Sequence, residues 1–275
     1  MERMKRKSME FEFWGVRGTS PVSPPEKTSY GGHTPCAALK GIHGDRIVID
    51  AGTGMIRLGR KESRSPEKHA CYHILITHFH LDHVMGLPFF SPLYDGDVAL
   101  KFYAAAPEAE TEKYLSGLMA GRYFPLDWDA TPARKSYTDI TDKEFSIGRV
   151  SVSSCPLNHP QESVAYRFKR DGRILITATD TEHPESGCDG RLADFCRRAD
   201  VLVYDASFTP EEYAASRRGW GHSTWEAGAA LALEAGVGKL ILSHFNPEYS
   251  DAVIEAMIRR ARERFAPTEG AHETG

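Results

Sequence analysis

The chain has 275 residues, of which 41% are hydrophobic and 26% charged, and its formal net charge is −4. This composition is ordinary for a globular protein with a full hydrophobic core. The acidic balance excludes a general attraction to nucleic acid or to an anionic membrane surface, so an anionic substrate needs a local positive site.

The chain contains no apolar run of membrane-spanning length, and its basic start, MERMKRKSME, lacks the apolar region of a signal peptide. The five cysteines are odd in number and form no CxxC pair, which favours reduced thiols in a cytoplasmic protein. No linker or repeat divides the middle of the chain. We therefore expect one domain over residues 1–275, with flexible ends at 1–8 and 266–275.

Strands and helices are expected along the whole chain. Apolar runs rich in β-branched and aromatic residues predict strands at 11–16, 36–41, 46–50, 73–77, 99–104, 201–205 and 239–244. A helix is expected after Gly54 and another over 108–119. A hairpin is expected at 163–179, with its turn at 169–172. The Ser-x-x-Glu spacing at 223–226 is that of a capping box and predicts a helix that begins near its serine.

A ligand-type residue follows five of the predicted strands. These residues are Asp50, His78, Asp180, Asp205 and His244. A single Asp or His in such a place commonly caps a turn or a helix. Five of them together favour a shared site, because binding sites in α/β architectures form outside the carboxyl ends of the strands.

The segment THFHLDH, residues 77–83, places three histidines and an aspartate directly behind a predicted buried strand. His78 and His80 are two residues apart, so on an extended strand end they point to the same side. Asp82 and His83 follow where the chain turns. Imidazole and carboxylate groups suit Zn, and also Fe or Mn. We expect a metal site here rather than a group of capping and core histidines, each of which would need its own hydrogen-bond partner.

This segment resembles the HxHxDH signature of the metallo-β-lactamase fold hydrolases. The resemblance continues in PLNHP, TATDT and LSHF, so that the family's ligand positions are matched by His78, His80, Asp82, His83, His159, Asp180 and His244. It implies an α/β fold, the four-layer αββα sandwich. It also implies two divalent metal ions, Zn foremost with Mn or Fe as alternatives. One ion would be held by His78, His80 and His159, the other by Asp82, His83 and His244, and both by Asp180.

The same resemblance implies hydrolysis. Two metal ions about 3.5–4 Å apart can share a water molecule and supply hydroxide at neutral pH. His80 stands where the flavo-diiron oxidoreductases of the superfamily usually carry Glu, which points to a hydrolase. We expect Asp82 to take part in catalysis as well as in metal binding.

The stretch WGHSTWEAGAALALEAGVGKLILSHFNPEY resembles the phosphodiesterase branch of the family, which includes tRNA 3′-processing endonucleases and small-molecule phosphodiesterases. In that branch an extra histidine precedes a helix shortly before the last metal ligand, and here it is His222. A helix N-terminus favours anionic oxygen. We expect His222 to bind a phosphate oxygen or to protonate the leaving alkoxide. The alternative is a histidine that only fixes the entry to the helix.

The stretch FWGVRGTSPVSPPEKTSYGGHTPCAAL resembles the bacterial subgroup described as cyclic-nucleotide-phosphodiesterase-like. Arg17 and His33 lie in its two loops and are expected to contact the substrate, with an exposed loop charge as the alternative for Arg17. His33 stands where the subgroup usually has Asn, and Gln161 stands where it often has Gly. These departures bear on substrate fit near the loops.

The expected substrate is a small phosphodiester, with a cyclic nucleotide as one candidate. Many tRNA 3′-processing enzymes carry a long tRNA-binding arm between the third histidine and the bridging aspartate, and the interval from His159 to Asp180 has room for only one hairpin. We expect no membrane partner and no stable nucleic-acid binding, and a homodimer is allowed. The alternatives are a tRNA 3′-processing-type endoribonuclease, a thioester or lactone hydrolase and a non-catalytic metal-binding scaffold.

An insertion at 121–137 interleaves aromatic residues with cations. Such a segment can stack on a base while its cations meet phosphate, which would make it a substrate lid. The alternative is that it packs on its own domain or forms a dimer contact.

Overall fold

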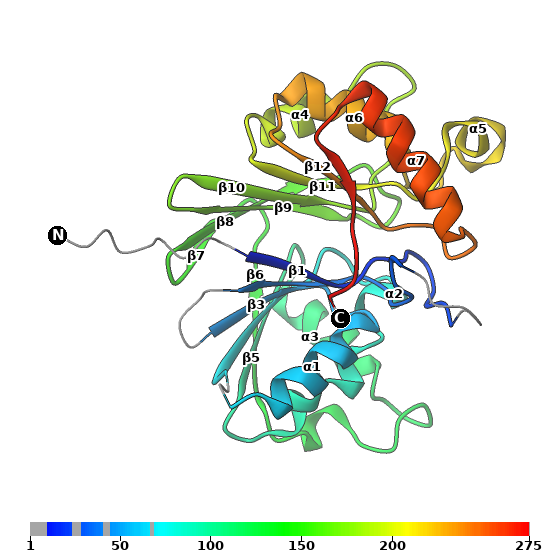
Figure 1. Cartoon of the computed structure of the whole chain (residues 1–275). Helices are drawn as coiled ribbons and strands as arrows, with labels where there is room; N and C mark the ends of the chain where they lie inside the picture. Colours follow the sequence, from blue (N-terminus) through cyan, green and yellow to red (C-terminus); the bar gives the residue numbers. More distant parts are fainter. Residues whose placement is uncertain (1–9, 24–28, 41–44, 67–68, 275) are drawn as a thin grey trace.

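The chain forms two β-sheets that lie face to face, with helices on the outer face of each sheet (Figure 1). The computed structural model describes residues 10–23, 29–40, 45–66 and 69–274. Within them, helix, sheet, sheet and helix follow one another as layers, which confirms the αββα sandwich implied by the sequence resemblance.

The first sheet has six strands in chain order, from β1 to β6. The strands are β1 (Glu10–Gly15), β2 (Cys36–Lys40), β3 (Asp45–Ile49), β4 (Cys71–Leu75), β5 (Ala99–Ala104) and β6 (Arg134–Asp139). The first three pair antiparallel, whereas β3 to β6 are parallel. The carboxyl ends of β3 and β4 therefore meet at one edge of the sheet, where Asp50 and His78 follow.

The second sheet has seven strands in the order β13-β12-β11-β10-β9-β8-β7. The strands are β7 (Glu144–Ile147), β8 (Val150–Pro156), β9 (Val164–Arg170), β10 (Arg173–Ala178), β11 (Val201–Asp205), β12 (Leu240–Ser243) and β13 (Thr268–Gly270). The strands from β10 to β13 are parallel. Their carboxyl ends deliver Asp180, Asp205 and His244 to a common edge.

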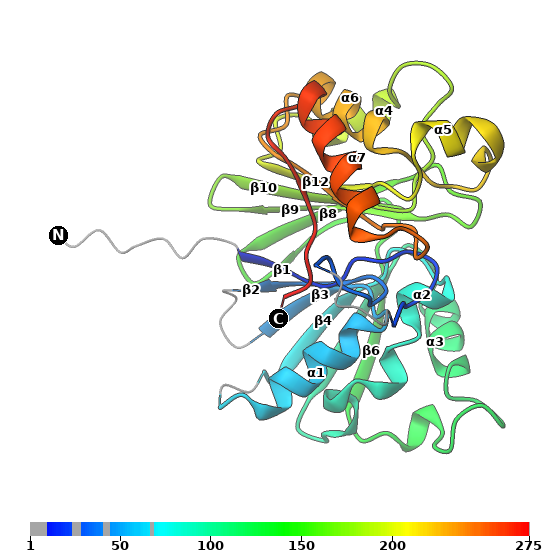
Figure 2. The ribbon, with the colours of Figure 1, turned by 45° about the vertical axis from the view of Figure 1, so that its right-hand side comes forward.

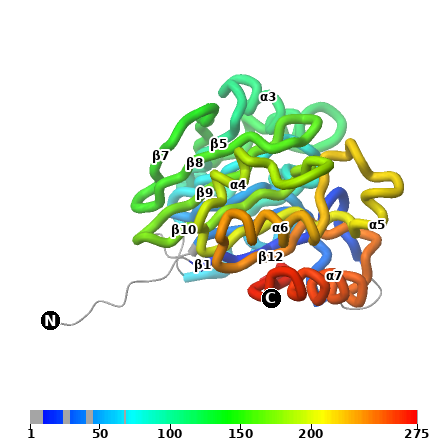
Figure 3. The backbone as a smooth tube through the Cα atoms, turned by 90° about the horizontal axis from the view of Figure 1, so that it is seen from above, coloured from blue at the N-terminus to red at the C-terminus, as the bar shows by residue number. Residues whose placement is uncertain are grey.

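Helices cover both outer faces. The helices are α1 (Gly54–Arg64), α2 (Leu81–Val84), α3 (Glu108–Gly117), α4 (Gly190–Cys196), α5 (Pro210–Glu212), α6 (Trp225–Ala235) and α7 (Asp251–Arg264). The first sheet is covered by α1 and α3 (Figure 2), and α4, α6 and α7 lie side by side over the second sheet (Figure 3). Among the described residues, none of the helices combines the length and the apolar character that a bilayer span requires.

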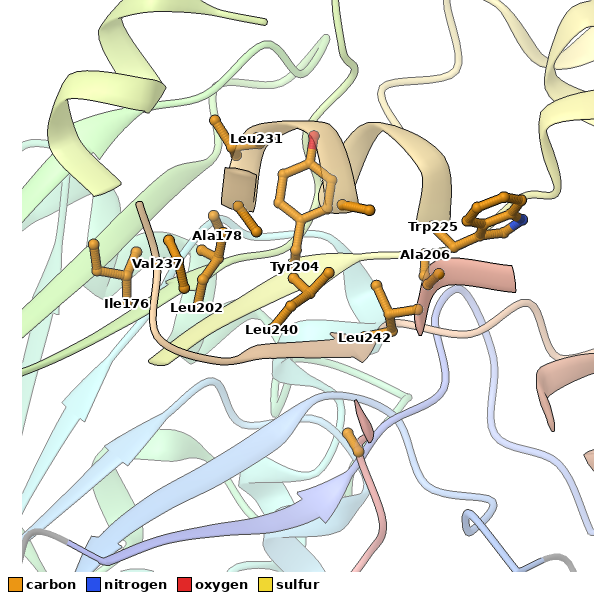
Figure 4. Close-up of a cluster of buried hydrophobic side chains, with 14 of the residues drawn as sticks. Ile176, Ala178, Leu202, Tyr204, Ala206, Trp225, Leu231, Val237, Leu240 and Leu242 are labelled. Carbon is orange, nitrogen blue, oxygen red and sulfur yellow. The ribbon is translucent and has the colours of Figure 1, made fainter. Parts of the chain in front are cut away.

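The core is layered because successive strand residues point to opposite faces. In β11, Leu202 and Tyr204 pack beneath the helices, together with Leu240 and Leu242 of β12 (Figure 4). Val203 of the same strand points the other way, into the apolar layer between the two sheets. The sheets and helices together thus fix the strand ends that carry the polar residues.

The helix expected near Ser223 is α6, which begins at Trp225. Thr224 is the N-cap of α6, and its side chain accepts a hydrogen bond from the backbone N–H of Ala227. The Ser223 hydroxyl lies instead 2.9 Å from His183 Nδ1 and 3.1 Å from the Tyr204 hydroxyl. The predicted start of the helix near Ser223 is thus confirmed, but the N-cap is Thr224, because buried partners occupy the Ser223 hydroxyl.

The tail also differs from the flexible end expected at 266–275. Thr268–Gly270 forms β13 and pairs in parallel with β12. The Glu273 carboxylate accepts a 2.6 Å hydrogen bond from the backbone N–H of His33 and forms an ion pair with Arg57. Strand pairing and a half-buried carboxylate therefore hold the tail against the body. The other expected flexible segment, 1–8, lies outside the described residues.

Candidate metal centre

The seven candidate metal ligands come from α2 and from the segments that follow strands of both sheets, and they lie together in the structure. The nitrogen atoms of the first triplet, His78, His80 and His159, lie within 4.8 Å of one another. The ligand atoms of the second triplet, Asp82, His83 and His244, also lie within 4.8 Å of one another. These are the two groups that the sequence resemblance implied.

Asp180 lies between the two triplets. Its Oδ2 is 3.3 Å from His83 Nε2, and its Oδ1 is 3.2 Å from His244 Nε2. Its Oδ1 is also 3.9 Å from His78 Nε2. This carboxylate therefore reaches members of both groups, as a bridging ligand would.

Hydrogen bonds on the far side of three imidazole rings fix their orientation. The Nδ1–H of His83 donates to the Asp50 carboxylate at 2.9 Å, and the Nδ1–H of His159 donates to the Gly221 carbonyl at 2.9 Å. His244 Nδ1 lies 3.0 Å from the Ser207 hydroxyl. Each ring then presents Nε2 to the cluster, the arrangement in which an outer partner orients a metal-binding histidine.

His80 is turned the other way. Its Nε2–H donates to the Gln161 side-chain oxygen at 2.9 Å, so that Nδ1 faces His159 Nε2 at 3.3 Å. Gln161, one of the two departures from the subgroup, thus has a definite place as a partner of the candidate ligand His80.

The residues present fit divalent cations. His78 Nε2 and Asp180 Oδ2 are buried and have no hydrogen-bond partner among the described residues. His83 Nε2 and His244 Nε2 face each other at 3.3 Å. The two nitrogens form a hydrogen bond only if one of them, and not both, carries a proton. Burying polar atoms without partners is costly. A cation between these nitrogen and carboxylate atoms would satisfy all of them, and imidazole with carboxylate is the donor set that zinc, iron and manganese accept.

The electrostatics also call for positive charge. Burial alone would raise the pKa of Asp180, but His244, His83 and His78 together hold it well below its ordinary value. Burial would lower the pKa of His83, yet Asp180, Asp82 and Asp50 raise it well above the usual range. The buried carboxylates thus favour positive charge within the cluster, either a proton on an imidazole or a cation.

Three of the strand-end residues have a left-handed backbone, which is rare outside glycine. The φ angles are 57° at Asp50, 62° at Asp180 and 59° at His244. Glycines allow the close approach of neighbouring chain, since a Cβ at Gly18 would lie 2.4 Å from the His244 ring. Strained backbone of this kind is characteristic of functional sites, where the surrounding structure stabilises it.

An open cavity of about 560 Å³ lies over the cluster and is lined by His80, Asp82, Asp180 and His222, among others. His222 Nδ1 lies 3.0 Å from the Asp205 carboxylate, which leaves Nε2 for another partner. Burial would lower the pKa of His222, but Asp205 and Asp180 raise it to about 9. A cation bound to Asp180 would reduce that shift. His222 thus lines the same cavity as the candidate ligands, and its contact with a substrate phosphate stays a prediction.

Asp205 organises this wall. One carboxylate oxygen accepts hydrogen bonds from the backbone N–H groups of Ser207 and Ser223, and the other accepts from the backbone N–H of Asp180 and faces His222. Asp50 has a similar place on the other side, where it accepts from Thr77 as well as from His83. Both aspartates thus orient candidate ligands or the candidate acid.

The expectation for Arg17 needs correction. Its side chain is 1% exposed and donates to the carbonyl oxygens of Gly31, Asn246 and Tyr249 at 2.9, 3.2 and 2.8 Å. The guanidinium joins three segments of backbone and does not line the cavity over the candidate ligands. Arg17 is neither a phosphate contact nor an exposed loop charge in this structure.

Arg17→Ala is therefore expected to destabilise the fold by about 2–4 kcal/mol, because three carbonyl groups lose their donor. The KM for a phosphodiester should change little in the folded fraction. Urea unfolding and steady-state kinetics at a temperature below the transition measure both quantities. The matched control is Arg149→Ala, at a side chain that is 80% exposed, where a change within about 0.5 kcal/mol is expected. A large rise in KM with unchanged stability would restore the phosphate role.

His33 lies beside the tail rather than on the cavity wall. Its Nδ1 is 3.2 Å from the Thr53 hydroxyl, and its backbone N–H donates to Glu273. Burial, with Arg57 and Arg60 nearby, lowers the pKa of its imidazole. Its role in substrate binding stays a prediction.

The insertion at 121–137 packs largely on its own domain. Trp128 is 3% exposed, and its indole N–H donates to the Tyr137 hydroxyl at 2.9 Å. The Lys135 ammonium donates to the Thr131 and Ala133 carbonyls and lies over the Trp128 ring. Trp128, Tyr137 and Lys135 thus contact one another and nearby backbone. This supports the alternative that the insertion packs on its own domain.

The residues of the cavity wall that sequence reasoning missed include Phe208, Arg217 and Trp220. The signal available was the close spacing of an arginine and a tryptophan directly before His222, in SRRGWGHST. Their arrangement depends on the π-helical segment Tyr213–Arg217 and on the turn after it. The sequence pattern does not predict either element.

Comparison with known proteins agrees with the geometry. The family model described as Beta-lactamase superfamily domain matches residues 45–245. The chain is 24% identical to a ribonuclease Z of Porphyromonas gingivalis, over 88% of this chain and 92% of that protein. It is 29% identical to a ribonuclease BN of Escherichia coli, over 73% of this chain and 79% of that protein.

Two solved structures share the fold. The metallo-β-lactamase fold protein YhfI from Bacillus subtilis aligns with a TM-score of 0.71 and 18% identity, over 98% of each chain. A diphosphatase from the PhnP family aligns with a TM-score of 0.69 and 16% identity, over 96% of this chain and 95% of that one. With the family match over most of the chain, these findings show that the protein belongs to the metallo-β-lactamase superfamily, as a metal-dependent hydrolase related to the tRNA 3′-processing enzymes.

Proposed function

We propose that the protein hydrolyses a small phosphodiester, with a cyclic nucleotide as one candidate, and that it does so with two divalent metal ions, zinc foremost. His78, His80 and His159 would hold one ion, Asp82, His83 and His244 the other, and Asp180 both. Such ions, when bound, lower the pKa of a water ligand and neutralise charge on phosphoryl oxygens. The cysteines, which are all free thiols, support the further proposal of a cytoplasmic location.

The observation that carries the phosphodiester assignment is the placement of His222. Asp205 orients its ring through Nδ1 and raises the pKa of the imidazole, which favours the protonated form. Nε2 can then donate to a phosphate oxygen or to a leaving alkoxide in the cavity. A thioester substrate has a better leaving group, a thiolate, and gives less reason for such an acid.

The loop that contains Gly18 donates a hydrogen bond to the Asp82 carboxylate. The backbone N–H of Thr19 donates to Asp82 Oδ2 at 2.8 Å, and His83 and His244 hold the pKa of this carboxyl far below its ordinary value although burial opposes this. Asp82 is therefore an anionic group at the cavity wall. This supports its proposed double part as ligand and catalytic residue.

The second candidate is a tRNA 3′-processing-type endoribonuclease, which the names of the two relatives favour. The interval between His159 and Asp180 bears on it. The structure describes that interval completely, and β9 and β10 take up most of it as a short hairpin in the second sheet. No protruding arm is left there to bind tRNA, which supports the small substrate. The proposal allows a homodimer but does not require one.

The purified protein should contain close to two zinc, manganese or iron ions per chain and should hydrolyse bis(p-nitrophenyl) phosphate or a cyclic nucleotide faster than precursor tRNA. Metal analysis and a panel of these substrates with a thioester provide the measurement. Binding of tRNA should be weak at physiological salt, because the net charge of −4 offers few phosphate contacts. Position-specific trimming of precursor tRNA at a higher kcat/KM than any small diester would overturn the proposal in favour of the second candidate.

A further inference from the structure

An exposed tryptophan forms part of the cavity wall beside the candidate metal ligands. Trp220 is 53% exposed, although the other three tryptophans of the chain are buried. The guanidinium carbon of Arg217 lies 4.4 Å from the centre of the Trp220 ring and 5.6 Å from that of Phe208. Exposing a large apolar ring to water is unfavourable, and such surfaces commonly mark binding sites.

Phe208 connects this pair to the candidate acid. It is 5% exposed and makes edge-to-face contacts with Trp220, at 6.3 Å between ring centres, and with His222, at 5.9 Å. Its backbone N–H donates to the Ser223 carbonyl, which fixes the ring against the start of α6. A ligand whose phosphate lies at His222 therefore has Trp220 and Arg217 one aromatic ring away.

The charge of Arg217 is not neutralised within the described part of the chain, where no carboxylate oxygen lies within 4.0 Å of its guanidinium and no side-chain hydrogen bond is formed. Its neighbour Arg218 is different, because it forms an ion pair with Glu185 at 3.3 Å. A guanidinium that lies over an indole keeps its N–H donors in its own plane, free for hydrogen-bond acceptors beside it. Arg217 thus offers donors along the edge of an aromatic platform.

We propose that Trp220 and Arg217 form a nucleobase-binding platform, so that the substrate of the proposed phosphodiesterase carries a nucleobase; this rests on the proposed function. A planar base stacks on the open part of the indole and presents ring nitrogen and carbonyl acceptors to the guanidinium. An alkyl or acyl chain would leave those donors unused. The exposed Glu248 lines the same cavity and disfavours a second phosphate group there.

Two p-nitrophenyl esters with the same leaving group separate base recognition from chemistry. Thymidine 5′-(p-nitrophenyl phosphate) contains a base, and methyl p-nitrophenyl phosphate does not. The wild-type protein should have the higher kcat/KM on the thymidine ester. Trp220→Ala should raise the KM for that ester about 10- to 100-fold, which corresponds to the loss of one stacked base, with kcat within about twofold. The methyl ester should be unaffected within about twofold.

Three further variants sharpen the comparison. Trp220→Phe keeps a stacking ring and should recover most of the loss, whereas Arg217→Gln should raise the KM for the thymidine ester alone. Tyr123→Ala is the matched control, since Tyr123 is an aromatic side chain that is 93% exposed and does not line the cavity. It should leave both esters unchanged. An equal loss on both esters in Trp220→Ala would overturn the nucleobase assignment.

Binding without turnover provides an independent readout. Adenosine 5′-monophosphate should quench the fluorescence of Trp220 in the wild-type protein, and the quenching should vanish in Trp220→Phe, because Trp14, Trp128 and Trp225 are at most 3% exposed. Hydrolysis of both esters with neither quenching nor a Trp220→Ala effect would overturn the platform and leave the proposed function standing. Quenching without hydrolysis of any diester would support the platform and remove the proposed function instead.

Discussion

Asp180→Asn is expected to deplete the metal and to abolish hydrolysis of every diester. The carboxylate lies within 3.3 Å of ring nitrogens of both His83 and His244 and is 2% exposed, so its charge is buried between the two candidate metal positions. The amide has nearly the same shape but only one acceptor oxygen and no charge, so it cannot bridge two cations. Metal content should fall well below that of the wild type, and kcat should reach background on cyclic nucleotide and p-nitrophenyl ester alike.

Asp180→Ala should show the same losses together with a lower stability. Removing one member of a buried charged group costs about 3–5 kcal/mol, because His83 keeps its charge without this partner. Comparing the two variants separates metal loss from unfolding, with circular dichroism and metal analysis on the same samples. Asp194→Ala is the control, since its side chain is 70% exposed and lies outside the cavity wall. Full metal occupancy in Asp180→Asn would contradict the bridging role.

The candidate ligands were predictable because each belongs to a short local pattern. THFHLDH carries four of them within seven residues, Asp180 and His244 follow predicted apolar strands, and His159 lies in the family-like stretch PLNHP. The strands themselves are marked by buried β-branched runs, and parallel pairing brings their ends to one edge. What the structure adds is the outer partners of the rings, such as Asp50 for His83, which come from residues far apart in the sequence.

Arg17 shows why other parts of the structure could not be predicted from the sequence. Two of the carbonyl groups that it binds come from positions 229 and 232 residues later in the chain. No local pattern distinguishes an arginine that folds inward to such partners from one that reaches a ligand. The same limit applies to Trp220, whose neighbours are set by a π-helical segment and a turn.

The strands β6, β7 and β8 were also not predicted. In β6, RKSYTD, the side chains are exposed or half-buried throughout, because this strand lies at the edge of its sheet. An edge strand buries too little apolar surface to show the alternation by which strands are recognised. Pairing with β5, and not local propensity, makes this segment a strand.

His222→Ala is expected to lower kcat about 10²- to 10⁴-fold on a cyclic nucleotide while leaving metal content and folding intact. The ring forms a hydrogen bond with Asp205, and three backbone N–H groups also hold this carboxylate, which therefore stays in place without the ring. The loss should be smaller for p-nitrophenyl esters, since p-nitrophenolate leaves without a proton. His272→Ala is the control, as this exposed histidine lies outside the cavity wall.

The pH dependence of kcat tests whether His222 donates a proton to the leaving group. The pKa of His222 is raised to about 9 by Asp205 and Asp180, although burial alone would lower it, and bound cations would bring it down again. The imidazolium is present below this pKa and is lost as pH rises through it, so kcat on the cyclic nucleotide should fall at alkaline pH. The p-nitrophenyl ester should not show that descending limb, and His222→Ala should lack it on both substrates. An unchanged kcat for His222→Ala on the cyclic nucleotide would make His222 a structural residue and would remove the main support for a phosphodiester substrate.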